Sequence, residues 1–170
     1  MALIVRALEG APVDFVIGDM GLALAAIDAL ETSLARRKAL RRHVWRPVKF
    51  HDLLRRYGVG QPELTARRAE ILAAAAVGRV PEAVAAAGAP IGLRTLEDIA
   101  ARVARLAEEA ATPPLTAQQV DLLEAVLGVA DVGARALTRF RDLAADAPAL
   151  RPAVDRFAAR LDALDRAGLD

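Results

Sequence analysis

Apolar residues recur at helical spacing in segment after segment of this 170-residue chain. The clearest segment has apolar side chains in the pattern that lines one face of an α-helix, at Leu96, Ile99, Ala100, Val103, Leu106 and Ala107. Thr95 precedes this segment as a predicted N-cap, acidic residues occupy its first turn, and the prolines in 112–114 end it. A chain patterned in this way is constrained to a fold built mainly from helices.

The same pattern predicts about nine helices along the chain, most of them bounded by caps, glycines or prolines. The expected ranges, ten with the short N-terminal one counted, are 2–9, 20–30, 34–44, 47–57, 62–77, 81–88, 95–111, 116–127, 131–147 and from 152 onward. Ser33 and Asp131 are predicted N-caps, and TAQQ at 116–119 is a predicted capping box. The helices differ in length and signature, so no fixed-period repeat is visible.

The composition supports this interpretation. Hydrophobic residues make up 55% of the chain and many of them are alanine, the strongest helix former, whereas aromatic residues make up only 4%. A sheet protein would usually contain more aromatic and β-branched residues. The chain contains no cysteine, which excludes disulfides and thiolate metal sites. We therefore expect a mainly α, multi-helix fold.

One short segment near the N-terminus departs from the helical pattern. Val13, Phe15 and Ile17 fall on one side of an extended segment, which predicts a single short strand. One strand cannot form a sheet, so this segment suggests a piece of a larger α/β body. Its unpaired edge predicts self-association through Val13–Ile17.

The sequence carries no pattern typical of secretion or of a membrane span. Its first ten residues, MALIVRALEG, lack a basic leader and a long apolar stretch. The longest apolar runs, such as ILAAAAV, fall far short of the ~18–20 residues that a membrane helix needs. We therefore expect a soluble, intracellular protein without a membrane partner.

The net charge of +1 conceals a strongly basic segment. Residues 34–57 contain nine lysines and arginines against one acid, Asp52, whereas the remaining residues carry 14 bases and 21 acids. Such an asymmetry favours an anionic partner. The residues predicted to form the basic surface are Arg36, Arg37, Lys38, Arg41, Arg42, Arg46 and Lys49.

The kind of anionic partner depends on which side chains face outward. Burying several arginines together without acids would be costly. The predicted arrangement has Arg37, Arg41 and Arg42 exposed, and Leu40, Val44 and Trp45 turned toward the core. An acidic protein surface or an anionic small ligand is favoured over nucleic acid. RNA binding by the 36–49 segment, with Trp45 stacked on a base, stays the alternative.

Residues able to carry out chemistry are scarce. Ser33, the only serine, lies outside any nucleophile motif and is better explained as a cap. His43 and His51 lack a metal-binding spacing. Asp14 and Asp19 flank the predicted strand, where surface and capping roles are commoner than acid–base chemistry. The sequence therefore predicts no catalytic, cofactor-binding or metal-ligating residue.

Four phrases match a known pattern. GDMGL at 18–22 matches a strand end reading Gly-Asp-(Leu/Val)-Gly-Leu, and IDAL at 27–30 matches a Leu/Ile-Asp-Ala-Leu helix. HVWRP at 43–47 matches a His-Phe-Trp-Arg-Pro-like phrase, and FAARLDALDRAGLD at 157–170 matches a closing helix. Together they resemble the regulatory subunit of ATP phosphoribosyltransferase, a relative of histidyl-tRNA synthetase, in its alphaproteobacterial form. Ala23 departs from the family, which has phenylalanine there.

The resemblance implies a partial class II synthetase-like core in 1–33 and a helical inserted domain in 34–170. It also implies a non-catalytic, cytoplasmic partner of the catalytic subunit, which joins ATP to phosphoribosyl pyrophosphate in the first step of histidine biosynthesis. In that family the regulatory subunit supports activity and relays feedback by histidine. The histidine-recognising segment of the synthetases has no counterpart in this sequence, so no ligand-binding residue carries over. A structural helical domain without a ligand is a third interpretation.

Overall fold

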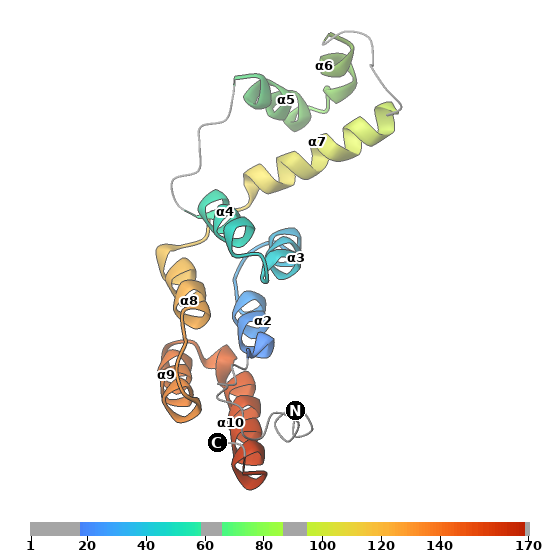
Figure 1. The fold of residues 1–170 in the computed structure, drawn as a ribbon. Coiled ribbons are helices and arrows are strands. Elements are labelled where there is room, and N and C mark those ends of the chain that lie inside the picture. Colours follow the sequence, from blue (N-terminus) through green and yellow to red (C-terminus); the bar gives the residue numbers. More distant parts are fainter. Residues whose placement is uncertain (1–17, 59–65, 87–94, 169–170) are drawn as a thin grey trace.

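The computed structural model describes residues 18–58, 66–86 and 95–168, which form nine α-helices and one short 3-10 helix (Figure 1). The elements are α2 (Met20–Asp28), α3 (Leu34–His43), α4 (Pro47–Tyr57), α5 (Ala66–Ala76), α6 (Val80–Ala86), α7 (Leu96–Ala111), α8 (Ala117–Leu127), α9 (Gly133–Asp146), η1 (Pro148–Leu150) and α10 (Arg151–Arg166). The predicted mainly helical fold is confirmed for these residues. The helix expected at 2–9 and the strand expected at Val13–Ile17 lie outside the described residues.

Helices α2, α3, α4, α8, α9 and α10 form a bundle around one core, and α2 lies at its centre, against α3, α8, α10 and η1 (Figure 1). The apolar stripes of these helices face one another and form the core. Its largest fully buried apolar side chains are Leu22, Ile27, Leu40, Phe50, Leu54, Leu115, Leu123 and Leu150. The core therefore joins residues from both ends of the described chain, while the predicted division at residues 33 and 34 stays a prediction.

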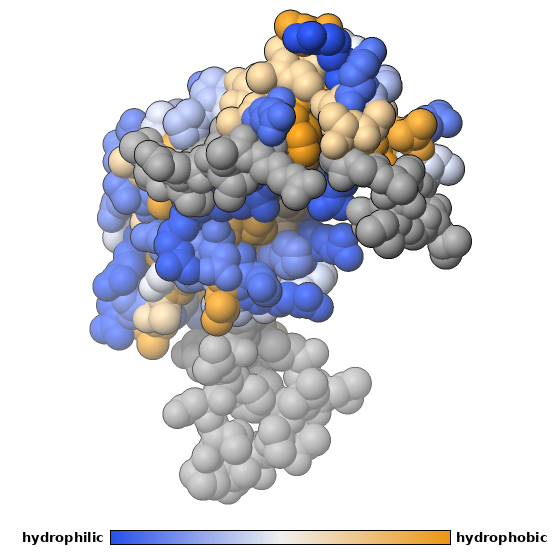
Figure 2. Space-filling model, turned by 90° about the horizontal axis from the view of Figure 1, so that it is seen from above, coloured by the Kyte–Doolittle hydropathy of each residue, from blue (hydrophilic) through white to orange (hydrophobic). Residues whose placement is uncertain are grey.

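Helices α5, α6 and α7 pack against one another at the far end of the bundle (Figure 1). Among their described residues only Val103 is buried, and Val77 and Leu96 are largely exposed. Figure 2 looks onto this end and shows apolar side chains interspersed with hydrophilic ones on its surface. Small alanine side chains cover little area, so this trio buries less apolar surface than the main bundle does.

The trio leaves the bundle and returns to it at one place. Gly58 and Leu115 form an isolated parallel bridge, and the Leu115 amide donates to the Tyr57 carbonyl at 2.7 Å. This is the one β-type pairing within the described residues. Tyr57 ends α4, and Leu115 follows α7 by four residues. The segment between them is therefore held at both ends by the same pair of residues.

Several predicted helix ends are confirmed by their hydrogen bonds. The Ser33 hydroxyl accepts from the Arg36 amide at the start of α3. Thr95 and Thr116 each form a capping box, in which the hydroxyl and the side chain three residues later exchange hydrogen bonds with each other's backbone amides. Asp19 caps α2 by accepting from the Gly21 amide at 2.7 Å, and it also pairs with Arg160 of α10. The capping contacts are local, which is why the sequence revealed most of them, whereas the pair with Arg160 joins residues 141 positions apart.

The predicted cap at Asp131 is wrong by one residue. Val132 is the N-cap of α9 and makes no side-chain capping bond. The Asp131 carboxylate instead accepts from the Val132 amide at 3.1 Å and from Arg135 Nε at 2.8 Å, and it lies 3.4 Å from Arg139 Nε. Its hydrogen bond with Arg135 holds the pKa of Asp131 below its ordinary value.

None of the described helices combines the length and the apolar character that crossing a membrane requires.

Candidate interaction surface on α3 and α4

Helices α3 and α4 pack as a pair, and each buries one apolar stripe. Leu40 and Val44 are buried as predicted, and they hold the inner side of α3 and of the turn that follows it. Phe50 and Leu54 do the same for α4, which begins at Pro47 because proline suits the first turn of a helix. The basic residues of this segment lie mostly on the outward faces of the pair.

Trp45 lies on the outward side, and 69% of its surface is exposed. The prediction that it turns toward the core is therefore wrong. Helix α3 ends at His43, and the chain turns through residues 44 and 45 before α4 begins. Val44 occupies the inward position in this turn, so Trp45 points to solvent. Large aromatic side chains are enriched at protein-binding surfaces, so the exposure of Trp45 marks this turn as a candidate binding surface.

Arg36 does not belong to the exposed surface, although the sequence places it there. Its side chain is only 1% exposed, and it is the one buried charged residue in the described part of the chain. Arg36 Nε donates to Glu109 Oε1 at 3.0 Å. Its two terminal nitrogens donate to the carbonyl oxygens of Glu109, Thr112 and Pro113 at 3.2, 3.1 and 2.7 Å.

The burial of Arg36 has a clear physical cause. The last carbonyl groups of a helix have no partner within that helix, and α7 ends at Ala111 just before two prolines. A guanidinium group presents five N–H donors in a fixed plane, which lets Arg36 satisfy several of these oxygens together. The carboxylate of Glu109 balances its charge. Arg36 therefore fastens α7 to α3 and contributes no charge to solvent.

Tyr57 closes the other side of this buried arginine. The guanidinium carbon of Arg36 lies 5.0 Å from the ring centre, and that of Arg56 lies 5.9 Å from it. Burial, with a smaller contribution from the nearby Glu109 carboxylate, raises the pKa of the Tyr57 hydroxyl above its ordinary value. The neighbouring arginines oppose this shift but do not cancel it.

Three of the predicted surface cations already have partners on the bundle. Arg41 forms an ion pair with the Asp28 side chain at the end of α2. Arg37 is half-buried and donates to the Asp28 carbonyl oxygen at 3.3 Å. Arg36 is accounted for by Glu109. These three side chains hold α3 in place more than they offer charge to a partner.

The other four predicted cations are exposed, and none forms an ion pair within the described residues. They are Lys38, Arg42, Arg46 and Lys49. Leu34 and Val48 stand beside them in the sequence and are 58% and 75% exposed. We call Leu34, Lys38, Arg42, Trp45, Arg46, Val48 and Lys49 the Trp45 surface. It combines free positive charge with exposed apolar area on one short helix pair.

The two histidines of this region take structural positions. His51 Nδ1 lies 2.7 Å from the Pro47 carbonyl oxygen, one turn earlier in α4. His43 is half-buried at the end of α3. In the described ranges, no three histidine, cysteine, aspartate or glutamate side chains come together in a way that could hold a metal ion.

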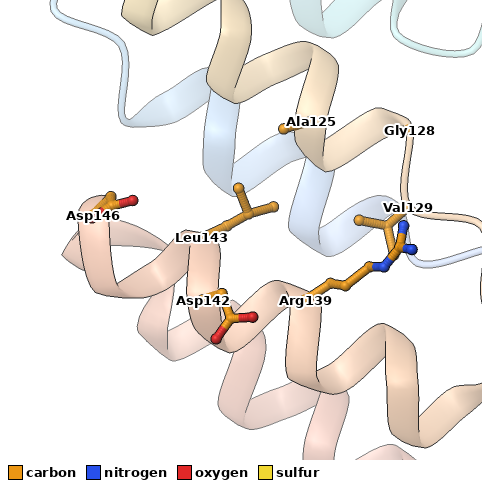
Figure 3. Close-up of a pocket in the computed structure, with 7 residues that line it drawn as sticks. All are labelled: Ala125, Gly128, Val129, Arg139, Asp142, Leu143 and Asp146. Atoms are coloured by element: carbon orange, nitrogen blue, oxygen red, sulfur yellow. The ribbon is translucent and has the colours of Figure 1, made fainter.

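A shallow groove lies between α8 and α9, with a volume of about 460 Å³ (Figure 3). Leu143 points from α9 toward Ala125 of α8, and Arg139 extends toward Val129. Asp142 and Asp146 line its α9 side. The groove offers one guanidinium and two carboxylates, and Arg139 lies within ion-pair distance of Asp131. Sequence reasoning gave no role to these residues, which only the packing of two separate helices brings together.

No family model matches this chain, and neither a curated protein nor a solved structure matches it.

Proposed function

We propose that this chain is a non-catalytic, protein-binding helical subunit that engages an acidic partner through the Trp45 surface. The observation that carries the proposal is the exposure of Trp45 amid four cations that have no carboxylate partner in the described structure. Unpaired surface cations steer an oppositely charged protein toward the surface. An exposed aromatic side chain provides the area that is desolvated when the partner arrives.

The resemblance to the regulatory subunit of ATP phosphoribosyltransferase makes the proposal more specific. Under this proposal the partner is the catalytic subunit of that enzyme, in the cytoplasm, and the complex serves the first step of histidine biosynthesis. The matched phrase HVWRP at 43–47 supports this, because it contains Trp45 and Arg46, two members of the Trp45 surface. The matched phrase at 18–22 supplies Asp19, which caps α2 and pairs with Arg160 of α10.

Co-purification with the catalytic subunit tests the proposal. We expect the 170-residue chain to retain the catalytic subunit, and Lys38→Glu with Arg42→Glu to weaken retention about tenfold or more. Arg102→Glu with Arg105→Glu is the matched control, because both arginines are exposed on α7 and the change in charge is identical. Equal retention by all three proteins would count against the surface, and no retention by any of them against the named partner.

RNA binding is the second candidate, and the exposure of Trp45 is the observation that favours it. An aromatic ring open to solvent beside lysines and arginines can stack on a nucleotide base. Binding of this kind weakens steeply as salt rises, because neutralised phosphates release counterions. A single-stranded RNA titrated at several salt concentrations separates the two candidates. Tight binding with a steep salt dependence, lost in Trp45→Ala, would favour RNA.

A further inference from the structure

We infer that the element recognised by the Trp45 surface is an acidic amphipathic helix of the partner, with Trp45 as its apolar anchor. This inference rests on the proposed protein-binding function and specifies the chemistry of the partner. It depends on how charged and apolar side chains alternate along α3 and on where they point.

The outward face of α3 presents its side chains in a regular row. Leu34, Lys38 and Arg42 are spaced four residues apart and are all exposed, while Leu40 lies on the opposite, buried face. Residues four apart on a helix lie on one face at intervals of roughly 6 Å. A helix running along this row would present its own side chains at the same interval, which suits side chains packing between helices.

The row carries apolar groups at both ends and charge between them. Leu34 begins α3, which rises roughly 15 Å over its ten residues, and Trp45 follows the last of them, His43, by two positions. Lys38 and Arg42 come between them along the chain. The complementary helix therefore has carboxylates on the turns facing Lys38 and Arg42, and apolar residues facing Leu34 and Trp45.

This mixed character favours a protein helix over a nucleic acid. A phosphate backbone could pair with the lysines and arginines, and a base could stack on Trp45. A nucleic acid has no aliphatic side chain to place against Leu34 and Val48, which are 58% and 75% exposed. An amphipathic helix with spaced acids can match both kinds of group.

Trp45 gives the test a direct readout, because it is the only tryptophan in the chain. Its fluorescence emission reports the polarity around this side chain. The probe is a synthetic amphipathic peptide with glutamates on one face flanked by leucines and with no tryptophan. Its comparison is a peptide of the same composition whose order is scrambled. Single-stranded RNA is titrated in parallel.

We expect the amphipathic peptide to bind with a blue shift of Trp45 emission, and the scrambled peptide to bind at least about tenfold more weakly, which corresponds to about 1.4 kcal/mol. Leu34→Ser should reduce peptide binding. Leu96→Ser is its matched control, because Leu96 also begins a helix and is 57% exposed. Equal binding of both peptides, tighter binding of RNA, or an unchanged Trp45 emission on binding would each overturn the inference.

The inference and the proposed function can fail separately. Suppose that Lys38→Glu with Arg42→Glu weakens retention of the catalytic subunit, but the amphipathic peptide binds no better than the scrambled one. The proposed function then stands, and the inference that the partner presents an acidic amphipathic helix is wrong. If Lys38→Glu with Arg42→Glu alters neither experiment, both are wrong.

Discussion

The guanidinium group of Arg36 lies 5.0 Å from the centre of the Tyr57 ring, so one buried cation touches the end of α4 while it bonds the end of α7. Arg36 itself belongs to α3. Three helices that are distant in the sequence therefore meet at one side chain. This contact, together with the bridge between Gly58 and Leu115, attaches α7 to the bundle.

Replacing Arg36 by methionine should destabilise the fold by about 3 kcal/mol, because it leaves the Glu109 carboxylate and three carbonyl oxygens without their donors. Denaturant unfolding measures the change. Arg37→Met is the control, because Arg37 is only half-buried and makes one backbone bond. A loss no larger than that of the control would mean that Arg36 does not fasten α7 to α3.

Glu109→Gln should cost less than Arg36→Met. An amide oxygen can still accept from Arg36 Nε, and three of the four hydrogen bonds of Arg36 end on backbone carbonyls that remain. The same unfolding measurement compares the two variants. Equal losses would show that the ion pair with Glu109, rather than the carbonyls, carries the stabilisation.

Tyr57 should ionise above the ordinary tyrosine pKa of about 10, because burial disfavours the phenolate. Folding raises the pKa of Tyr57, so the protonated hydroxyl contributes to the free energy of unfolding. This contribution is fully present below pH 10 and is lost as the pH rises through the folded-state pKa. Absorbance of the phenolate follows this titration without ambiguity, because Tyr57 is the only tyrosine. Titration at or below the ordinary pKa would contradict the burial, and Tyr57→Phe should remove this pH dependence.

Trp45→Ala should change stability by no more than about 0.5 kcal/mol, since the side chain is 69% exposed. Phe50→Ala, five residues later and 1% exposed, should cost about 3–5 kcal/mol. Thermal or denaturant unfolding separates the two. The emission of the unmodified protein should resemble that of tryptophan in water. A large destabilisation by Trp45→Ala would restore the prediction that this side chain packs inward.

Asp131→Asn should lower the melting temperature at neutral pH, because the carboxylate accepts from Arg135 and the Val132 amide. The pKa of Asp131 is lowered on folding, so its contribution is present above the ordinary pKa of about 4 and disappears as the pH falls through the folded-state value. Melting curves at neutral and at acidic pH check this. The difference between Asp131→Asn and wild type should vanish in acid, and a constant difference would argue against the ionised contact.

The sequence predicted features that depend on nearby residues. The caps at Ser33, Thr95 and Thr116 rest on spacings of three residues, and the buried stripe of Phe50 and Leu54 rests on one helical repeat. Local geometry alone determines such features. The single strand and the helix at 2–9 lie outside the described residues and stay predictions.

The candidate site was predicted only in part, because its details depend on contacts between distant segments. Arg36 was assigned to the surface because its nearest sequence neighbours are basic, but its partner Glu109 lies 73 positions away. Single tryptophans usually lie in cores, which predicts an inward position for Trp45. Its orientation follows from the residue at which α3 stops, and helix ends are the least certain part of a sequence-based prediction.

The pairing of Tyr57 with Leu115 has a consequence for how this chain could be rebuilt. Segments whose two ends lie together can be exchanged or shortened with little effect on the remainder. Helices α5 to α7 occupy such a position, while the residues that fill the main core come before Gly58 and from Leu115 onward. The bundle is therefore a scaffold with a natural grafting point, provided that a grafted module keeps the acceptors for Arg36 that residues 109–113 supply at the end of α7.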